Sequence, residues 1–96
     1  MPTYIVLGNY TEQGIRQIKD TPKRTEAVKE MAKKSGVTLK ETFWTLGAYD
    51  FVSIIEAPDD QSVMTLGMSV GAQGNVHTQT LRAFSAADIT AIVGKM

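Results

Sequence analysis

The stretch Val37–Ala57, VTLKETFWTLGAYDFVSIIEA, contains the clearest secondary-structure signal of the chain. Its first half mixes leucine, aromatic residues and threonines without a helical stripe, and its second half, Phe51–Ala57, is a compact β-branched run. Gly47–Asp50 lies between the two halves. This pattern predicts a β-hairpin that forms the second and third strands of the domain.

Amphipathic helices are predicted on both sides of this hairpin. Before it, Thr21 and Pro22 are typical of an N-cap and a first helical position, and an apolar stripe follows until a glycine ends the run. After it, Pro58–Asp60 breaks the sheet and supplies negative charge for a helix that runs toward Gly71 or Gly74. The hairpin therefore connects two helices.

Two further strands complete the pattern. Tyr4–Tyr10 is rich in β-branched and aromatic residues, and Val76–Phe84 alternates threonine with other residues. Ser85 and Asp88 have the spacing of a capping box and predict a short last helix. The order predicts one α+β domain over residues 1–96, a ferredoxin-like βαββαβ fold with a short C-terminal helix and a four-stranded antiparallel sheet.

Glycines within the second helix leave two readings open. Gly67 and Gly71 are poor helix formers, so they are expected either to let the helix lie close to the sheet or to fray its C-terminal end. A short turn of helix between positions 13 and 19 is also expected before the first long helix.

Composition narrows the classes of function. The chain has 96 residues, 43% of them hydrophobic, and its ten Lys and Arg balance its ten Asp and Glu, so nothing in its net charge favours nucleic acid or an anionic membrane. It lacks cysteine and starts without a basic, apolar leader, so we expect a cytoplasmic protein with no membrane span. No metal or cofactor is expected, because a single histidine cannot form a metal site and the glycines match no nucleotide-binding motif.

The third strand is apolar on both faces. Phe51 and Ile55 point one way, and Val52 and Ile54 point the other. If helices cover only one face of the sheet, one of these pairs lies on the uncovered side. Monomers seldom expose large contiguous apolar patches, so the pattern predicts a homodimer or higher oligomer through the sheet face.

Five separated blocks of the sequence together resemble the GYD domain family; they are Tyr10–Ile15, Pro22–Arg24, Gly47–Asp50, Glu56–Asp60 and Gly74–Phe84. The resemblance spans nearly the whole chain and implies a ferredoxin-like fold related to the dimeric α/β-barrel group, and so a barrel-like dimer. In this chain Ala48 replaces the glycine expected directly before the signature tyrosine, with Gly47 one place earlier. Arginine is expected in many relatives where His77 stands here.

Polar and aromatic side chains near the predicted hairpin and strand ends are the candidate ligand-binding residues: Asn9, Arg24, Glu41, Trp44, Tyr49, Asp50, His77 and Arg82. Asn9 and Glu41 share the parity that would let them join His77 in a polar cluster, where the imidazole would act as a base. Arg24 and Arg82, with Lys23, are candidates for an anion. Each has a structural alternative: turn stabilisation by Asp50, surface ion pairs by the arginines, and packing by Trp44. No catalytic residue is assigned.

Three functions stay open. The first is an accessory module that acts as a homo-oligomer and holds a small, partly apolar or anionic ligand in a cavity beside the sheet. The second, suggested by analogy with dimeric α/β barrels, is a cofactor-independent isomerase or monooxygenase. The third is a protein-assembly or regulatory domain whose sheet binds another protein.

Overall fold

The computed structural model describes residues 1–96. In chain order its elements are β1 (Thr3–Tyr10), α1 (Glu12–Arg16), the 3₁₀ helix η1 (Ile18–Asp20), α2 (Thr21–Lys34), β2 (Thr38–Trp44), β3 (Phe51–Glu56), α3 (Asp60–Gly71), β4 (Val76–Ala83) and α4 (Ala86–Val93). The four strands form one antiparallel sheet in the order β2-β3-β1-β4. The predicted α+β, ferredoxin-like fold is confirmed.

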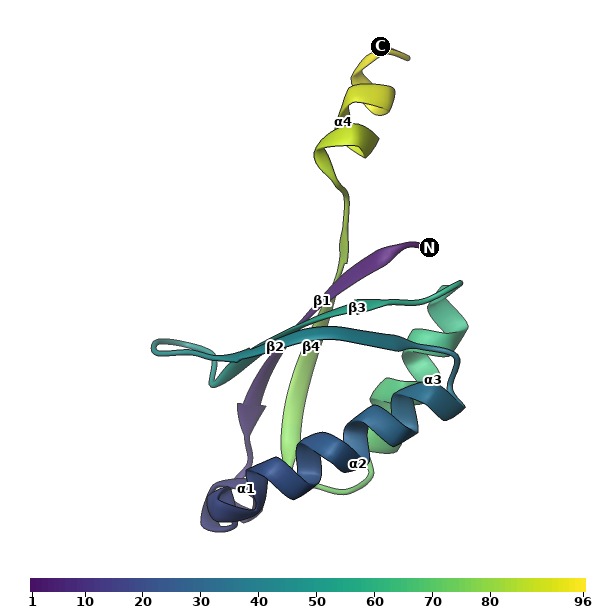
Figure 1. Ribbon diagram of the computed structural model, residues 1–96. Coiled ribbons are helices and arrows are strands. Elements are labelled where there is room, and N and C mark those ends of the chain that lie inside the picture. The colour runs from purple at the N-terminus through teal and green to yellow at the C-terminus, as the bar shows by residue number, and fades with distance from the viewer.

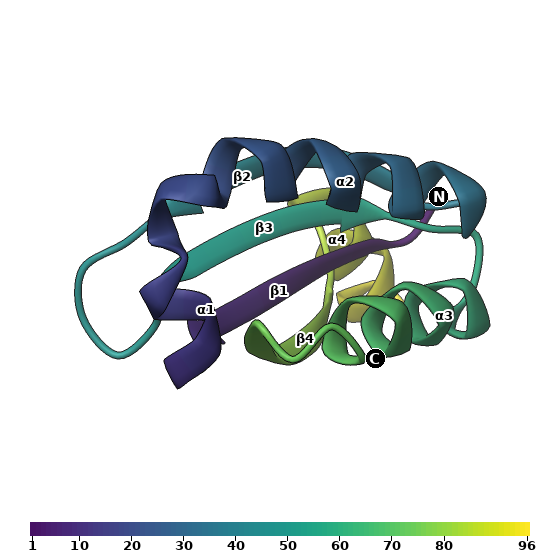
Figure 2. The ribbon, with the colours of Figure 1, turned by 90° about the horizontal axis from the view of Figure 1, so that it is seen from below.

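Both long helices cover the same face of the sheet. Figures 1 and 2 show α2 and α3 side by side on one face, whereas α4 rises from the end of β4 on the opposite side. The buried core lies between these two helices and the sheet, and its members are Tyr4, Ala32, Val37, Ile55, Ala57 and Leu66. None of the helices has the length and apolar character that a membrane span requires.

Helix capping follows the sequence at two sites and departs from it at one. Asp59 accepts a bond from the Ser62 backbone N–H at the start of α3, and Ser85 with Asp88 forms the predicted capping box of α4. Thr21, however, is the first residue of α2 and not its N-cap. Because η1 runs directly into α2, the Thr21 hydroxyl donates to the carbonyl of Ile18 in the preceding turn.

The glycine of the hairpin is required by its backbone conformation, whereas those of α3 are not. Gly47 has a φ of +104°, and no residue other than glycine has a positive φ, so Ala48 is unstrained. A Cβ at Gly67 or Gly71 would meet no atom within 4 Å. Close approach of α3 to the sheet therefore does not require these two glycines.

Candidate functional site

The uncovered face of the sheet is apolar across its middle. Phe51 and Ile55 line the helix side, so Val52 and Ile54 are the pair that faces away from the helices. The same alternation places six hydrophobic side chains in two rows across the bare face: Ile5, Leu7, Phe43, Val52, Ile54 and Leu81. Phe43 is 52% exposed and Leu81 is 40% exposed. We call these six residues the bare-face patch.

Helix α4 presents a second uncovered apolar surface on the same side of the molecule. Its stripe consists of Ile89, Ile92 and Val93, each 45–58% exposed, and Met96 beyond its end is 96% exposed. Figure 1 shows the helix standing clear of the domain beyond the end of β4, and Figure 2 shows it behind the sheet when the view is from the helix side. An apolar stripe with no covering element lies on the side where the bare-face patch is.

Polar candidates from the sequence gather at one corner of this face. Asn9 and His77 are direct cross-strand partners on β1 and β4. The Tyr49 hydroxyl donates to Gln79 Oε1 at 3.3 Å and so reaches the same corner from the hairpin. Glu41 pairs with Ile54 on the far side of the sheet, three strands away from β4 and roughly 20 Å from His77. The structure brings Asn9, Tyr49 and His77 together but leaves Glu41 apart.

Asp50 ties the hairpin to β1. Its carboxylate Oδ2 accepts the Tyr10 backbone N–H at 2.8 Å, and its own N–H donates to the Gly8 carbonyl at 2.8 Å. Both bonds continue the pairing of β1 with β3 to the residue just before β3 begins. Asp50 therefore has a structural role, because it fixes the hairpin to β1 at the end of the sheet.

Arg82 lies at the opposite end of the sheet from Arg24. Its guanidinium carbon is 5.5 Å from the ring centroid of Tyr4 and 4.6 Å from that of Phe84, and its Nη1 donates to the Thr3 carbonyl at 3.3 Å. The Tyr4 hydroxyl donates to Asp60 Oδ1 at 2.5 Å, and this bond raises the pKa of Tyr4 above its usual 10.0. Arg82 therefore stacks on aromatic rings, and the two arginines do not share one anion site.

A cavity of about 140 Å³ lies between the sheet and helices α2 and α3. Its walls are mostly apolar, with Val6, Val28, Leu39, Ile55, Val63, Leu66, Val70 and Val76 among them. Of the eight candidates from the sequence, it brings together Arg24 and Trp44. Trp44 Nε1 donates to the Tyr10 hydroxyl at 2.9 Å, which fixes both rings of the cavity wall.

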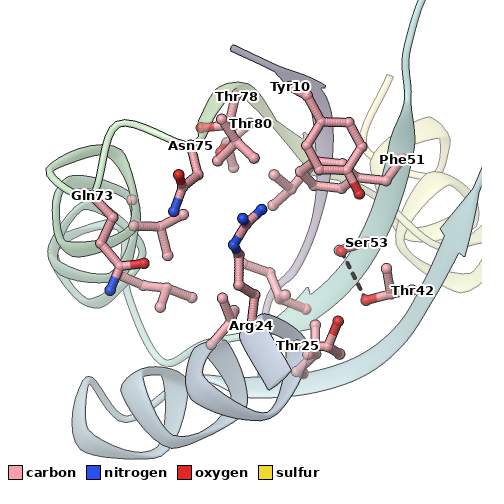
Figure 3. A pocket seen from close by; sticks show the side chains of 18 of the residues that line it. Tyr10, Arg24, Thr25, Thr42, Phe51, Ser53, Gln73, Asn75, Thr78 and Thr80 are labelled. Atoms are coloured by element: carbon pink, nitrogen blue, oxygen red, sulfur yellow. Dashed lines mark hydrogen bonds between the residues drawn. The ribbon is translucent and has the colours of Figure 1, made fainter. Parts of the chain in front are cut away.

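Arg24 is the only charged residue that lines the cavity. Its Nη1 donates to the Gly14 carbonyl at 3.3 Å, and its Nη2 donates to the Gln17 carbonyl at 3.1 Å and to Gln17 Oε1 at 2.8 Å. Figure 3 shows the guanidinium in the middle of the cavity view, with Asn75 facing it from the β4 side. The residues around η1 thus hold a fixed cation at the cavity.

Hydroxyl and amide groups of the cavity were not among the candidates from the sequence. Thr78 and Thr80 of β4 face the cavity, and Thr42 and Ser53 bond each other across β2 and β3 at 2.9 Å. Ser53 shares strand parity with the buried Ile55, and Thr78 and Thr80 share it with Val76 of the cavity wall, so hydroxyls on that parity are the sequence signal that would have found these three. Thr42 has the opposite parity to Leu39 and faces the cavity only because of the bulge between Leu39 and Glu41.

Asn75 is positioned by the turn after β1. Thr11 N–H donates to the Asn75 carbonyl at 3.0 Å, and Gln13 Nε2 donates to Asn75 Oδ1 at 2.8 Å. A Cβ at Gly14 would come within 2.0 Å of the Asn75 carbonyl oxygen, so only glycine permits this contact. Residues 11–14 thus bond to the segment 73–75, from which Gln73 and Asn75 line the cavity.

The family model described as "GYD domain" matches residues 4–93. The chain belongs to the GYD domain family. A protein of Thermus thermophilus, described as "Glutamine synthetase and cystathionine beta-lyase binding protein", is 36% identical over 92 residues, which are 95% of this GYD chain and 97% of that protein. The match therefore spans both proteins almost end to end.

Two crystal structures resemble the GYD domain fold. FFRP-DM1 superposes with a TM-score of 0.62 at 16% identity and covers 88% of this chain and 100% of its own. TTHA0845 from Thermus thermophilus superposes with a TM-score of 0.56 at 23% identity and covers 90% of this chain and 96% of its own. At these identities the likeness concerns the fold alone.

Proposed function

We propose that this GYD protein is an accessory protein that works as a homodimer and binds a metabolic enzyme. The observation that carries the proposal is the bare-face patch, a contiguous apolar surface on a face of the sheet that no helix of the same chain covers. The description of the Thermus relative as a binding protein for two enzymes supports the second part.

The area of the sheet face favours a second copy of the chain as its cover. Four strands about 4.8 Å apart and about 18 Å long give a flat footprint of roughly 350 Å². A stable interface buries about 800 Å² on each partner, so the sheet alone falls short. Side-chain relief adds area, but a further contact is needed.

Helix α4 supplies that contact. With eight residues it is about 12 Å long and about 10 Å wide, and it stands on the side that a stacked partner would occupy. In a two-fold dimer each copy adds its own α4 to the interface, which raises the flat footprint to roughly 470 Å² before side-chain relief is counted. The Ile89, Ile92 and Val93 stripe is then covered by the partner.

The outer surface of α3 remains free for an enzyme in such a dimer. After Asp60 this helix has no charged residue, and Met64 and Met68 are 58% and 68% exposed. Helix α2 beside it is charged, with Lys29 paired to Glu26 along its surface. Interfaces are depleted of Lys and Glu and enriched in Met, so the α3 surface is the better docking site.

Native mass spectrometry at micromolar concentration tests the dimer. We expect a dimer for the unchanged chain and a monomer for Phe43→Glu. In the dimer, a carboxylate at this position of the bare-face patch would be buried without a compensating positive charge. Ile15→Glu, at a 51% exposed residue on α1, is the matched control and should remain dimeric. A monomeric unchanged chain would contradict the proposal.

The contribution of α4 is tested separately. Ile92→Glu should shift the equilibrium toward monomer, whereas Ala91→Glu, on the opposite side of the same helix, should leave it unchanged. If both variants are as dimeric as the unchanged chain, α4 does not belong to the interface and the sheet contact alone survives.

The enzyme partner is tested with purified proteins in analytical ultracentrifugation. We expect a complex with the glutamine synthetase or the cystathionine beta-lyase of the same organism. Met68→Glu should weaken this complex about tenfold or more without changing the dimer, and Ala27→Glu on the exposed surface of α2 should leave it intact. Absence of a complex with either enzyme would refute the accessory role.

A further inference from the structure

The cavity between the sheet and helices α2 and α3 combines apolar walls with a single cation, and the proposed accessory role does not involve it. Its space of about 140 Å³ is lined mainly by aliphatic and aromatic side chains, and Arg24 is its only charged residue. An apolar cavity with one fixed cation selects a ligand with an apolar body and a single negative charge.

The hydrogen bonds of Arg24 leave donors free. Three of its five N–H groups bond Gly14 and Gln17, so Nε–H and one Nη1–H have no partner in the protein. No carboxylate lines the cavity to neutralise the guanidinium. The anchoring bonds also hold the side chain in place, which reduces the entropy lost when a ligand binds.

Asn75 adds a second donor from the opposite wall. Its Oδ1 already accepts from Gln13, so the side chain offers its Nδ2–H groups, and Figure 3 shows that nitrogen directed toward the space that Arg24 faces. These two sets of donors match a carboxylate, which only accepts hydrogen bonds. The Thr78 and Thr80 hydroxyls lie on the same side.

The volume of the cavity limits the size of the ligand's apolar body. A cavity of about 150 Å³ lined by aliphatic and aromatic residues is known to take benzene, so this one accommodates a body of about that size. We propose that the cavity binds a small organic monocarboxylate with an apolar body about as large as a benzene ring. Arg24 and Asn75 hold the carboxylate, and the aliphatic walls enclose the body. This inference does not depend on the dimer or on the enzyme partner.

Isothermal titration calorimetry with three probes that share a phenyl ring and have similar size tests the proposal. Benzoate should bind, benzamide should bind at least about tenfold more weakly because it lacks the charge, and benzylammonium should not bind. Equal affinity for benzoate and benzamide, or no heat with benzoate at millimolar concentration, would overturn the proposal.

Variants locate the site. Arg24→Gln should lose about tenfold or more in benzoate affinity, whereas Arg16→Gln, at an exposed arginine paired with Glu12, should not. Because Arg24→Gln also removes contacts to the 14–17 turn, Gly67→Leu serves as a second variant. Gly67 lines the cavity and has open space around it, so leucine there should occupy the cavity, keep the fold and abolish the benzoate signal. Unchanged benzoate binding in both variants would exclude this cavity as the site.

Discussion

At the scale of single residues, Gly8 shows how closely β1 packs against the first residue of β3. Its backbone lies under the Phe51 ring, and a Cβ at this position would come within 2.1 Å of the ring carbon Cζ. Phe51 is fixed in turn by Tyr10, whose ring centroid lies 5.8 Å away. The ring therefore cannot move aside without disturbing the cavity wall.

Gly8→Ala should lower the free energy of unfolding by about 1–3 kcal/mol, the usual cost of overpacking. Urea denaturation at a fixed protein concentration measures it as a lower midpoint with an unchanged slope. Gly67→Ala is the matched control: its Cβ meets no atom within 4 Å, and replacing a helical glycine should add about 0.5–1 kcal/mol. A stable Gly8→Ala variant would show that the Phe51 ring is mobile.

The roles of residues that depend on a short spacing in the sequence could be predicted, whereas roles that depend on the tertiary fold could not. The Ser85 and Asp88 capping box follows from a three-residue spacing, and the structure confirms it. The prediction that Thr21 is an N-cap is wrong, because η1 runs directly into α2. The local sequence does not indicate this continuity. The setting of Arg24 in the cavity depends on Gly14, Gln17 and Asn75, which only the folded chain brings around it.

At the scale of elements, the cap of α3 makes a prediction about pH. The Ser62 backbone N–H bonds the Asp59 carboxylate at 2.8 Å, and this bond lowers the pKa of Asp59 below its usual 3.8. A carboxyl group with a lowered pKa in the folded state stabilises the fold above its unfolded pKa. That stabilisation is lost as the pH falls through the folded pKa.

Asp59→Asn keeps a cap acceptor but removes the titration. We expect the unchanged chain to be the more stable of the two near neutral pH, and the difference between them to shrink as the pH falls below about 4. Thermal unfolding from pH 7 to pH 3 measures this difference in stability. The pKa of Asp88 is also lowered, but its contribution cancels in the difference because both proteins contain Asp88. A constant difference across this range would show that the Asp59 charge does not stabilise α3.

Strands and helices were predictable because each has a strong period or boundary. The alternation in β3 gives its two apolar faces, and the structure places Val52 and Ile54 on the uncovered one. The bulge between Leu39 and Glu41 in β2 leaves no such mark, although it decides which side chains of that strand face the cavity. The cross-strand pairing of Asn9 with His77 likewise comes from register, which a single sequence does not determine.

At the scale of the whole molecule, the dimer and the cavity should respond differently to mass action. Two copies associate through the bare-face patch and α4, so the melting temperature should rise with protein concentration, as it does for any fold stabilised by association. Benzoate binds within one copy, so at a given free concentration it should raise the melting temperature whether or not the copies associate. Phe43→Glu separates the two effects.

Differential scanning fluorimetry over a hundredfold range of protein concentration makes the comparison. The unchanged chain should show a melting temperature that depends on both protein and benzoate concentration. In Phe43→Glu the melting temperature should no longer depend on protein concentration but should still rise with benzoate. In Arg24→Gln it should no longer rise with benzoate but should still depend on protein concentration, because the two residues lie on opposite faces of the sheet. If Phe43→Glu also removed the response to benzoate, the cavity would need the second copy to be complete, and sheet face and cavity would form one coupled site.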